Sequence, residues 1–122
     1  MKRIQSIAIL LLLITSTFAG DKVATQKAAP QVKPTLVFFM NPNGAPCQQQ
    51  DQIIQQAKAE IEKFAQIRYV KTTVPMDRET FYQYGIRSLP NLLVVDAQGK
   101  ELRRFAPGIQ AIEMIMNGLT GK

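Results

Sequence analysis

The sequence predicts an α/β domain in which a mixed β-sheet is covered by helices on both faces. Three observations predict this class. The run 35–40 is apolar and β-favouring without polar alternation, which is typical of a central strand buried on both faces. Segments with helical periodicity alternate with further strand-like segments. A turn-forming Asp-Ala-Gln-Gly sequence at 96–99 joins the last two strands as an antiparallel hairpin.

The elements are predicted in the order β-α-β-α-β-β-α, with strands at 35–40, 66–73, 92–95 and 100–105. The first two strands flank a helix and are therefore expected to be parallel. Pro46 suits the first turn of that helix. Its apolar residues recur at steps of three and four: Ile54, Ala57, Ile61, Phe64 and Ala65.

Two further helices complete the predicted domain. A short helix spans 77–84, with Asp77 as its cap and Gly85 as its end. A C-terminal amphipathic helix is marked by the apolar residues Ile109, Ile112, Ile115, Met116 and Leu119.

The first residues have the pattern of a secretory signal peptide. Lys2 and Arg3 form a positive head, an apolar run fills 7–14, and small and polar residues follow up to Ala19. The apolar run is far shorter than the ~20 residues that span a bilayer. We expect cleavage after Ala19, a flexible leader at 20–34 and a domain at 35–122. The protein is then exported to the periplasm or secreted, with no membrane attachment after cleavage.

Charge and composition exclude several function classes. Without Lys2 and Arg3, 13 basic and 9 acidic side chains remain, a net charge of +4. The basic residues are scattered, which argues against nucleic-acid binding. The chain has no His and a single Cys, which excludes a His/Cys zinc site and a Cys–His or Ser–His–Asp catalytic group. We expect neither metal nor cofactor.

Two segments, together with the order of elements, resemble the thioredoxin superfamily. The stretch 39–47, Phe-Met-Asn-Pro-Asn-Gly-Ala-Pro-Cys, resembles the strand that runs into the Cys-x-Pro-Cys active site. The stretch 84–92, Tyr-Gly-Ile-Arg-Ser-Leu-Pro-Asn-Leu, is similar to the region around the family's cis-proline. With the turn at 96–99 and Gly108, the resemblance covers 35 to about 119. It implies a thioredoxin-like fold.

The sequence departs from the family pattern at the active site. Gly44 occupies the position of the attacking cysteine, and Cys47 that of the resolving cysteine. Asn43 replaces the tryptophan before the first cysteine, and Phe38 replaces the buried acid on the preceding strand. Turnover by a Cys-x-x-Cys dithiol within one molecule is therefore impossible. A mixed disulfide on Cys47 can be resolved only by an outside thiol.

Cys47 is the candidate catalytic residue, and Asn43, Gly44, Ala45 and Pro46 form its loop. A helix N-terminus favours the thiolate form, whereas burial against Phe38 opposes it. Glycine at position 44 is expected to improve access to the sulfur. Two alternatives stay open: Cys47 is an inert buried residue, as free cysteines often are, or it pairs with Cys47 of a second copy.

Leu89 and Pro90 are the candidate substrate-binding residues. The resemblance implies a cis Leu89–Pro90 bond that faces the Cys47 loop and leaves the Leu89 backbone free to pair with an extended peptide. The alternative is a trans Pro90 that only begins the strand.

Two functions follow from these residues. The first is thiol–disulfide exchange through Cys47 with an external resolving thiol, which would make the protein a monothiol disulfide oxidoreductase. The partners would be protein or low-molecular-weight thiols, and the protein a monomer. The second is a non-catalytic module that binds peptide or protein and has lost redox turnover.

Overall fold

The computed structural model describes residues 32–122. The predicted signal peptide at 1–19 and most of the predicted leader at 20–34 lie outside the described residues. None of the helices within residues 32–122 has the length and apolar character that crossing a membrane requires.

The described residues form a four-stranded mixed sheet in the order β2-β1-β3-β4. Its strands are β1 (Thr35–Met40), β2 (Gln66–Lys71), β3 (Asn91–Val95) and β4 (Glu101–Arg104). β1 pairs in parallel with β2 and antiparallel with β3, and β3 and β4 form the hairpin. The predicted order of elements, the parallel first pair and the terminal hairpin are all confirmed.

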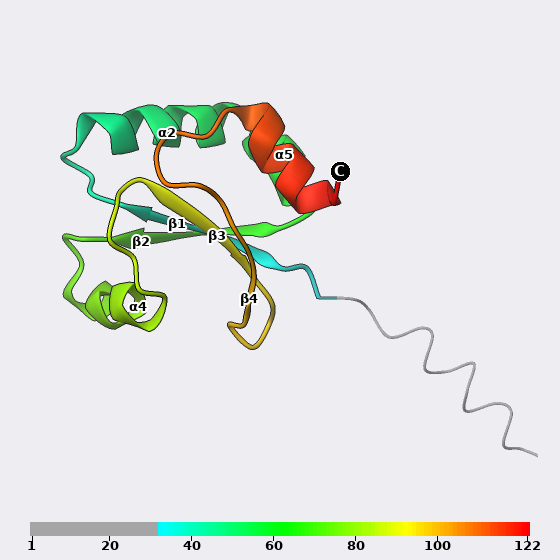
Figure 1. The fold of residues 1–122 in the computed structure, drawn as a ribbon. Helices are drawn as coiled ribbons and strands as arrows, with labels where there is room; N and C mark the ends of the chain where they lie inside the picture. Colours follow the sequence, from blue (N-terminus) through cyan, green and yellow to red (C-terminus); the bar gives the residue numbers. More distant parts are fainter. Residues whose placement is uncertain (1–31) are drawn as a thin grey trace, which may run out of the picture. The chain divides into compact units, whose positions relative to one another are not determined.

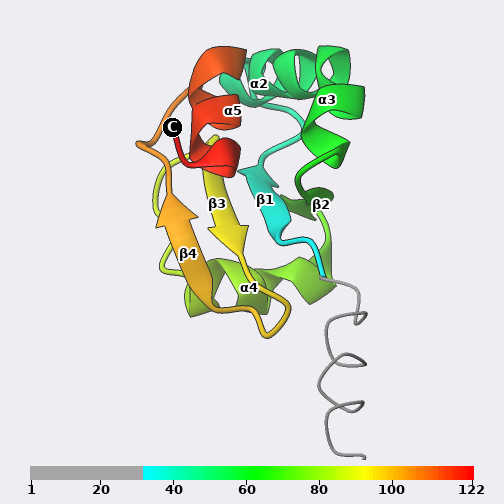
Figure 2. The same ribbon diagram turned by 90° about the vertical axis from the view of Figure 1, so that its right-hand side faces the viewer.

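Helices cover both faces of the sheet (Figure 1). α2 (Ala45–Gln56), α3 (Lys58–Glu62) and α5 (Ile112–Thr120) lie on one face. The 3-10 turn η1 (Pro75–Asp77) and α4 (Arg78–Gln83) lie on the other (Figure 2). The predicted α/β class with helices on both faces is confirmed.

β1 is the centre of the core, because its two faces supply two different apolar clusters. Leu36, Phe38 and Met40 face the cluster that includes Cys47 and residues of α2, α3 and α5. Val37 and Phe39 face the smaller cluster under α4. This two-sided burial explains why the strand reads as a continuous apolar run.

The prediction of a single first helix is wrong, because the segment forms two helices, α2 and α3, with a break at Ala57. The backbone of Ala57 leaves helical geometry (φ −106°, ψ 12°), and its N–H is shared between the carbonyls of Ile53 and Ile54. Ile54 before the break and Ile61 after it are both fully buried. Packing both segments on one sheet face thus overrides a local sequence that contains no helix breaker.

Three smaller predictions also need correction. Phe64, predicted to lie on the apolar face of the helix, is 40% exposed, because α3 ends at Glu62 and Phe64 lies in the turn after it. Ile109 is 39% exposed and precedes α5, which begins at Ile112. Asp77 precedes α4 but forms no side-chain cap; its carboxylate accepts the backbone N–H of Lys71 at 2.9 Å.

α5 approaches the hairpin so closely that only glycine fits at position 118. A Cβ built on Gly118 would lie 2.6 Å from Cε1 of Phe105, closer still to its Cζ, and 3.0 Å from Cδ of Arg103. Phe105 is itself buried and has little room to move.

We expect Gly118→Ala to lower the free energy of unfolding by about 1–2 kcal/mol, because the clash outweighs the gain in helix propensity. Urea unfolding measures the change. Asn117→Ala, on an exposed side chain of the same helix, is the matched control and should be nearly neutral. A stabilised Gly118→Ala protein would contradict the close approach.

Tyr69 on β2 links α2 to the sheet through side-chain hydrogen bonds. Its hydroxyl donates to Asp51 at 2.5 Å and accepts from the Gln55 amide at 2.6 Å. Its ring packs against Phe38 with centroids 5.4 Å apart. Burial, helped by the hydrogen bond to the Asp51 carboxylate, raises the pKa of Tyr69 to about 12 from 10.0.

This pKa shift predicts a loss of stability at high pH. Between pH 10 and about 12, the unfolded state releases the Tyr69 proton while the folded state retains it, so the free energy of unfolding falls as pH rises. Urea unfolding at several pH values measures the slope. In Tyr69→Phe the slope in this window should become shallower, with Tyr82→Phe as the exposed control. An unchanged slope in Tyr69→Phe would assign the loss to another group.

Candidate functional site

The candidate site is built from loops that leave one end of the sheet (Figure 1). β1 and β2 run towards this end, and β3 starts from it, because β1 is parallel to β2 and antiparallel to β3. The turn 41–44 between β1 and α2, the segment 72–77 after β2 and the segment 87–90 before β3 therefore meet there.

Cys47 lies in the first turn of α2, as predicted. Gly44 is the N-cap, which makes Cys47 the third helical residue. The backbone N–H of Asn41 donates to the Cys47 sulfur, with 3.3 Å between N and Sγ. The turn is held by further bonds, from Gly44 N–H to the Asn41 carbonyl at 2.9 Å and from the Gln48 amide to the Pro42 carbonyl at 2.8 Å.

The prediction that glycine at position 44 improves access to the Cys47 sulfur is wrong. The residue is 2% exposed and belongs to the cluster formed by Phe38, Met40 and their neighbours. Glycine at position 44 does not open a path, because the 41–44 turn folds over the sulfur and donates a hydrogen bond to it. A reagent in solution reaches this thiol only if the turn moves.

Gly44 has room for a side chain. Its backbone is extended (φ −92°, ψ 132°), a conformation that any residue adopts. A Cβ added there would be 3.5 Å from the Asn41 carbonyl oxygen and 3.8 Å from its Cβ, which are ordinary contacts. The backbone at position 44 therefore accepts a side chain without rearrangement.

The Leu89–Pro90 peptide bond is cis, as the resemblance implied. Pro90 is buried, and Leu89 packs against the same apolar cluster that contains Cys47. Ser88 is exposed. Within the described residues, the backbone N–H and C=O groups of Ser88 and Leu89 make no hydrogen bond. The two predicted site segments thus lie at the same end of the sheet, and one of them presents unpaired backbone.

Gln50 connects the two segments, and the sequence analysis missed it. The side chain is fully buried, and both of its polar atoms bond to the backbone of Gln110, which donates to Oε1 and accepts from Nε2. In the same loop, the Gly108 N–H donates to the Pro90 carbonyl at 3.0 Å. The sequence held one signal for the burial of Gln50: its spacing from Cys47 and Ile54 places it on the buried face of α2.

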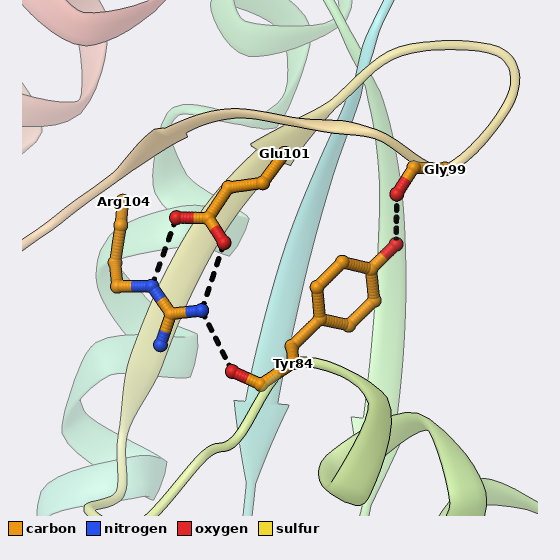
Figure 3. Close-up of polar contacts among 4 residues, drawn as sticks. All are labelled: Tyr84, Gly99, Glu101 and Arg104. Atoms are coloured by element: carbon orange, nitrogen blue, oxygen red, sulfur yellow. Dashed lines mark hydrogen bonds and ion pairs between the residues drawn. The ribbon is translucent and has the colours of Figure 1, made fainter.

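A second set of contacts holds the segment that leads to Pro90 (Figure 3). The Arg104 guanidinium makes two hydrogen bonds to the Glu101 carboxylate and donates to the Tyr84 carbonyl at 2.7 Å. The Tyr84 hydroxyl donates to the Gly99 carbonyl at 2.5 Å. The hydrogen bond from Arg104 also holds the pKa of Glu101 below its ordinary value. Tyr84 is therefore held on the β3–β4 hairpin, four residues before the unpaired backbone of Ser88 and Leu89 begins.

The chemistry available at this end of the sheet is limited. Cys47 is the single thiol of the chain, so no intramolecular dithiol can form. Across residues 32–122, no three His, Cys, Asp or Glu side chains are grouped so that they could hold a metal ion. The other loop residues, Asn43, Ala45 and Pro46, are exposed and carry no acid or base. What the site offers is one covered sulfur and a stretch of free backbone.

Comparisons with known proteins agree with this architecture. Among solved structures, a thioredoxin-fold protein from Helicobacter pylori superposes with a TM-score of 0.61 at 16% identity, over 71% of this chain and 66% of that one. A thioredoxin-like protein from Clostridium perfringens superposes with a TM-score of 0.60 at 21% sequence identity, over 80% of this chain and 79% of that one. Thioredoxin-2 of the malaria parasite superposes with a TM-score of 0.59 at 12% sequence identity, over 77% of this chain and 87% of that one. These likenesses show the fold alone.

A comparison with curated protein sequences gave no match. The family model described as a thioredoxin-like domain matches residues 22–119, which is most of the chain. The chain therefore belongs to the thioredoxin-like domain family.

Proposed function

We propose that the protein is an exported thioredoxin-like module that binds extended polypeptide along the free backbone of Ser88 and Leu89. The observation that carries this proposal is the contrast between the two parts of the site. The sulfur of Cys47 is covered (2% exposed), whereas the backbone before Pro90 has unpaired donors and acceptors. An extended peptide can pair with such unpaired backbone through main-chain hydrogen bonds, the interaction that drives strand addition at sheet edges.

The surroundings of this backbone support binding of a polypeptide. Met76 is 88% exposed in the segment after β2, and Ile109 is exposed in the loop held against Pro90. Exposed apolar side chains at the same end of the sheet can contact the alternate side chains of an added strand. Methionine adapts its shape to different contacts, which suits a site that accepts more than one sequence.

Thiol–disulfide exchange through Cys47 is the second candidate, favoured by the hydrogen bond from the Asn41 N–H to the sulfur. A place at a helix N-terminus is a feature of reactive cysteines in several protein families. Exchange would require the 41–44 turn to open and a protein or low-molecular-weight thiol to resolve the mixed disulfide. The burial of the sulfur is the reason we place binding first.

Export and oligomeric state are part of the same proposal. The signal-peptide pattern at 1–19 supports action in the periplasm or outside the cell. The burial of Cys47 argues against a disulfide between two copies, since two covered sulfurs cannot meet without opening both turns. We propose a monomer.

If binding is the function, Cys47→Ala should bind a Thr/Val-rich extended peptide within about twofold of the unmodified protein, because no covalent step is involved. Fluorescence anisotropy measures the affinity, and the amide signals of Ser88 and Leu89 should shift in NMR spectra on titration. The variant should lose about 1–3 kcal/mol of stability, since the Asn41 N–H loses its acceptor. Loss of binding in folded Cys47→Ala, together with rapid native alkylation of Cys47 in the unmodified protein, would favour exchange instead.

Gly44→Cys tests whether the scaffold still supports the family's dithiol chemistry. The extended backbone and ordinary contacts at this position predict a folded variant that forms a 44–47 disulfide and gains insulin-reducing activity. Gly44→Ser, which fills the same space without a thiol, is the matched control and should remain inactive. Absence of activity in a variant that does form the disulfide would show that the surrounding residues no longer serve redox work.

A further inference from the structure

Arg87 is an exposed cation within the segment that leads to the unpaired backbone. It precedes Leu89 by two residues. Three ion pairs form among the described residues, and none of them involves Arg87. No hydrogen bond within residues 32–122 engages its side chain or its backbone. Its guanidinium is therefore available to a partner that lies along this segment.

The neighbouring charges add to this positive character. Lys71 ends β2, and Arg78 begins α4. Two acidic residues lie in the same stretch: Asp77, whose carboxylate accepts the backbone N–H of Lys71, and Glu79 in the first turn of α4. Lys71, Arg78 and Arg87 against Asp77 and Glu79 give this end of the sheet a net charge of +1.

We propose that this end of the sheet selects extended peptides that carry an acidic side chain, and that Arg87 is the residue that recognises the acidic side chain. The inference rests on the peptide binding proposed above. A side chain opposite a strand residue lies within about 5.5 Å of it, so a partner strand would place one of its side chains next to Arg87. The planar guanidinium can bind a carboxylate through two parallel hydrogen bonds.

The leader of this chain is a poor occupant for the same end of the sheet. The leader at 20–34 contains three basic residues, Lys22, Lys27 and Lys33, and one acidic residue, Asp21, which gives a net charge of +2. The charge of the leader has the same sign as the charge at this end of the sheet, whereas an acidic peptide from another protein has the opposite sign. Charge complementarity therefore favours a separate acidic partner over the leader.

The test compares two Thr/Val-rich peptides that differ only in carrying two glutamates or two lysines at their centre. Fluorescence anisotropy on the full mature chain should give about twofold to fivefold tighter binding of the glutamate peptide, as expected for an exposed ion pair. Raising the salt from about 0.05 M to about 0.5 M should remove the preference. Arg87→Gln should abolish it, and Arg87→Glu should reverse it.

Arg103→Glu on β4 is the matched control, since it makes the same change in net charge at another exposed position and should keep the glutamate preference. Equal binding of both peptides to the unmodified protein would overturn the proposed selectivity and leave peptide binding intact. An equal effect of Arg103→Glu would overturn the role of Arg87. Failure of either peptide to bind would overturn the proposed function as well. Tighter binding of a peptide with the sequence 22–33 would identify the leader as the occupant and contradict an acidic partner.

Discussion

The two-sided burial of β1 is the constraint on which the rest of the structure depends. Phe38 and Phe39 are fully buried on opposite faces, so both faces of the strand must be covered and both of its edges paired. The parallel neighbour β2 and the antiparallel neighbour β3 satisfy this requirement. Their directions bring the end of β1 and the start of β3 to one end of the sheet. The site is thus a consequence of strand direction.

Covering the sulfur of Cys47 changes the character of the site. The residue is part of the apolar cluster under α2, and its Sγ accepts the one hydrogen bond that the turn offers, from Asn41. A polar N–H left without an acceptor in such surroundings costs about 1–3 kcal/mol. The thiol is therefore a stabilising element of the turn whether or not it also reacts, and its presence alone does not imply exchange.

Two networks hold the segments around the unpaired backbone. Gln50 joins α2 to the loop that contacts Pro90, and Arg104 joins the hairpin to the carbonyl of Tyr84. Residues 88 and 89 lie between these anchors without hydrogen bonds of their own in the described part of the chain. Backbone fixed on both sides and free in the middle loses little conformational freedom when a partner strand binds.

The sequence by itself determined the order of elements, the parallel and hairpin pairings and the place of Cys47 at a helix start, because hydrophobic period and turn chemistry are local properties. It did not predict the break at Ala57 or the exposure of Phe64, since packing on the sheet decides both. Nor did it predict the cover over Cys47, which depends on how the turn 41–44 folds back onto α2. The buried role of Gln50 needed residue 110, sixty positions away, to supply its partners. Local pattern selects the elements, whereas contacts between distant segments decide which atoms are covered and which are free.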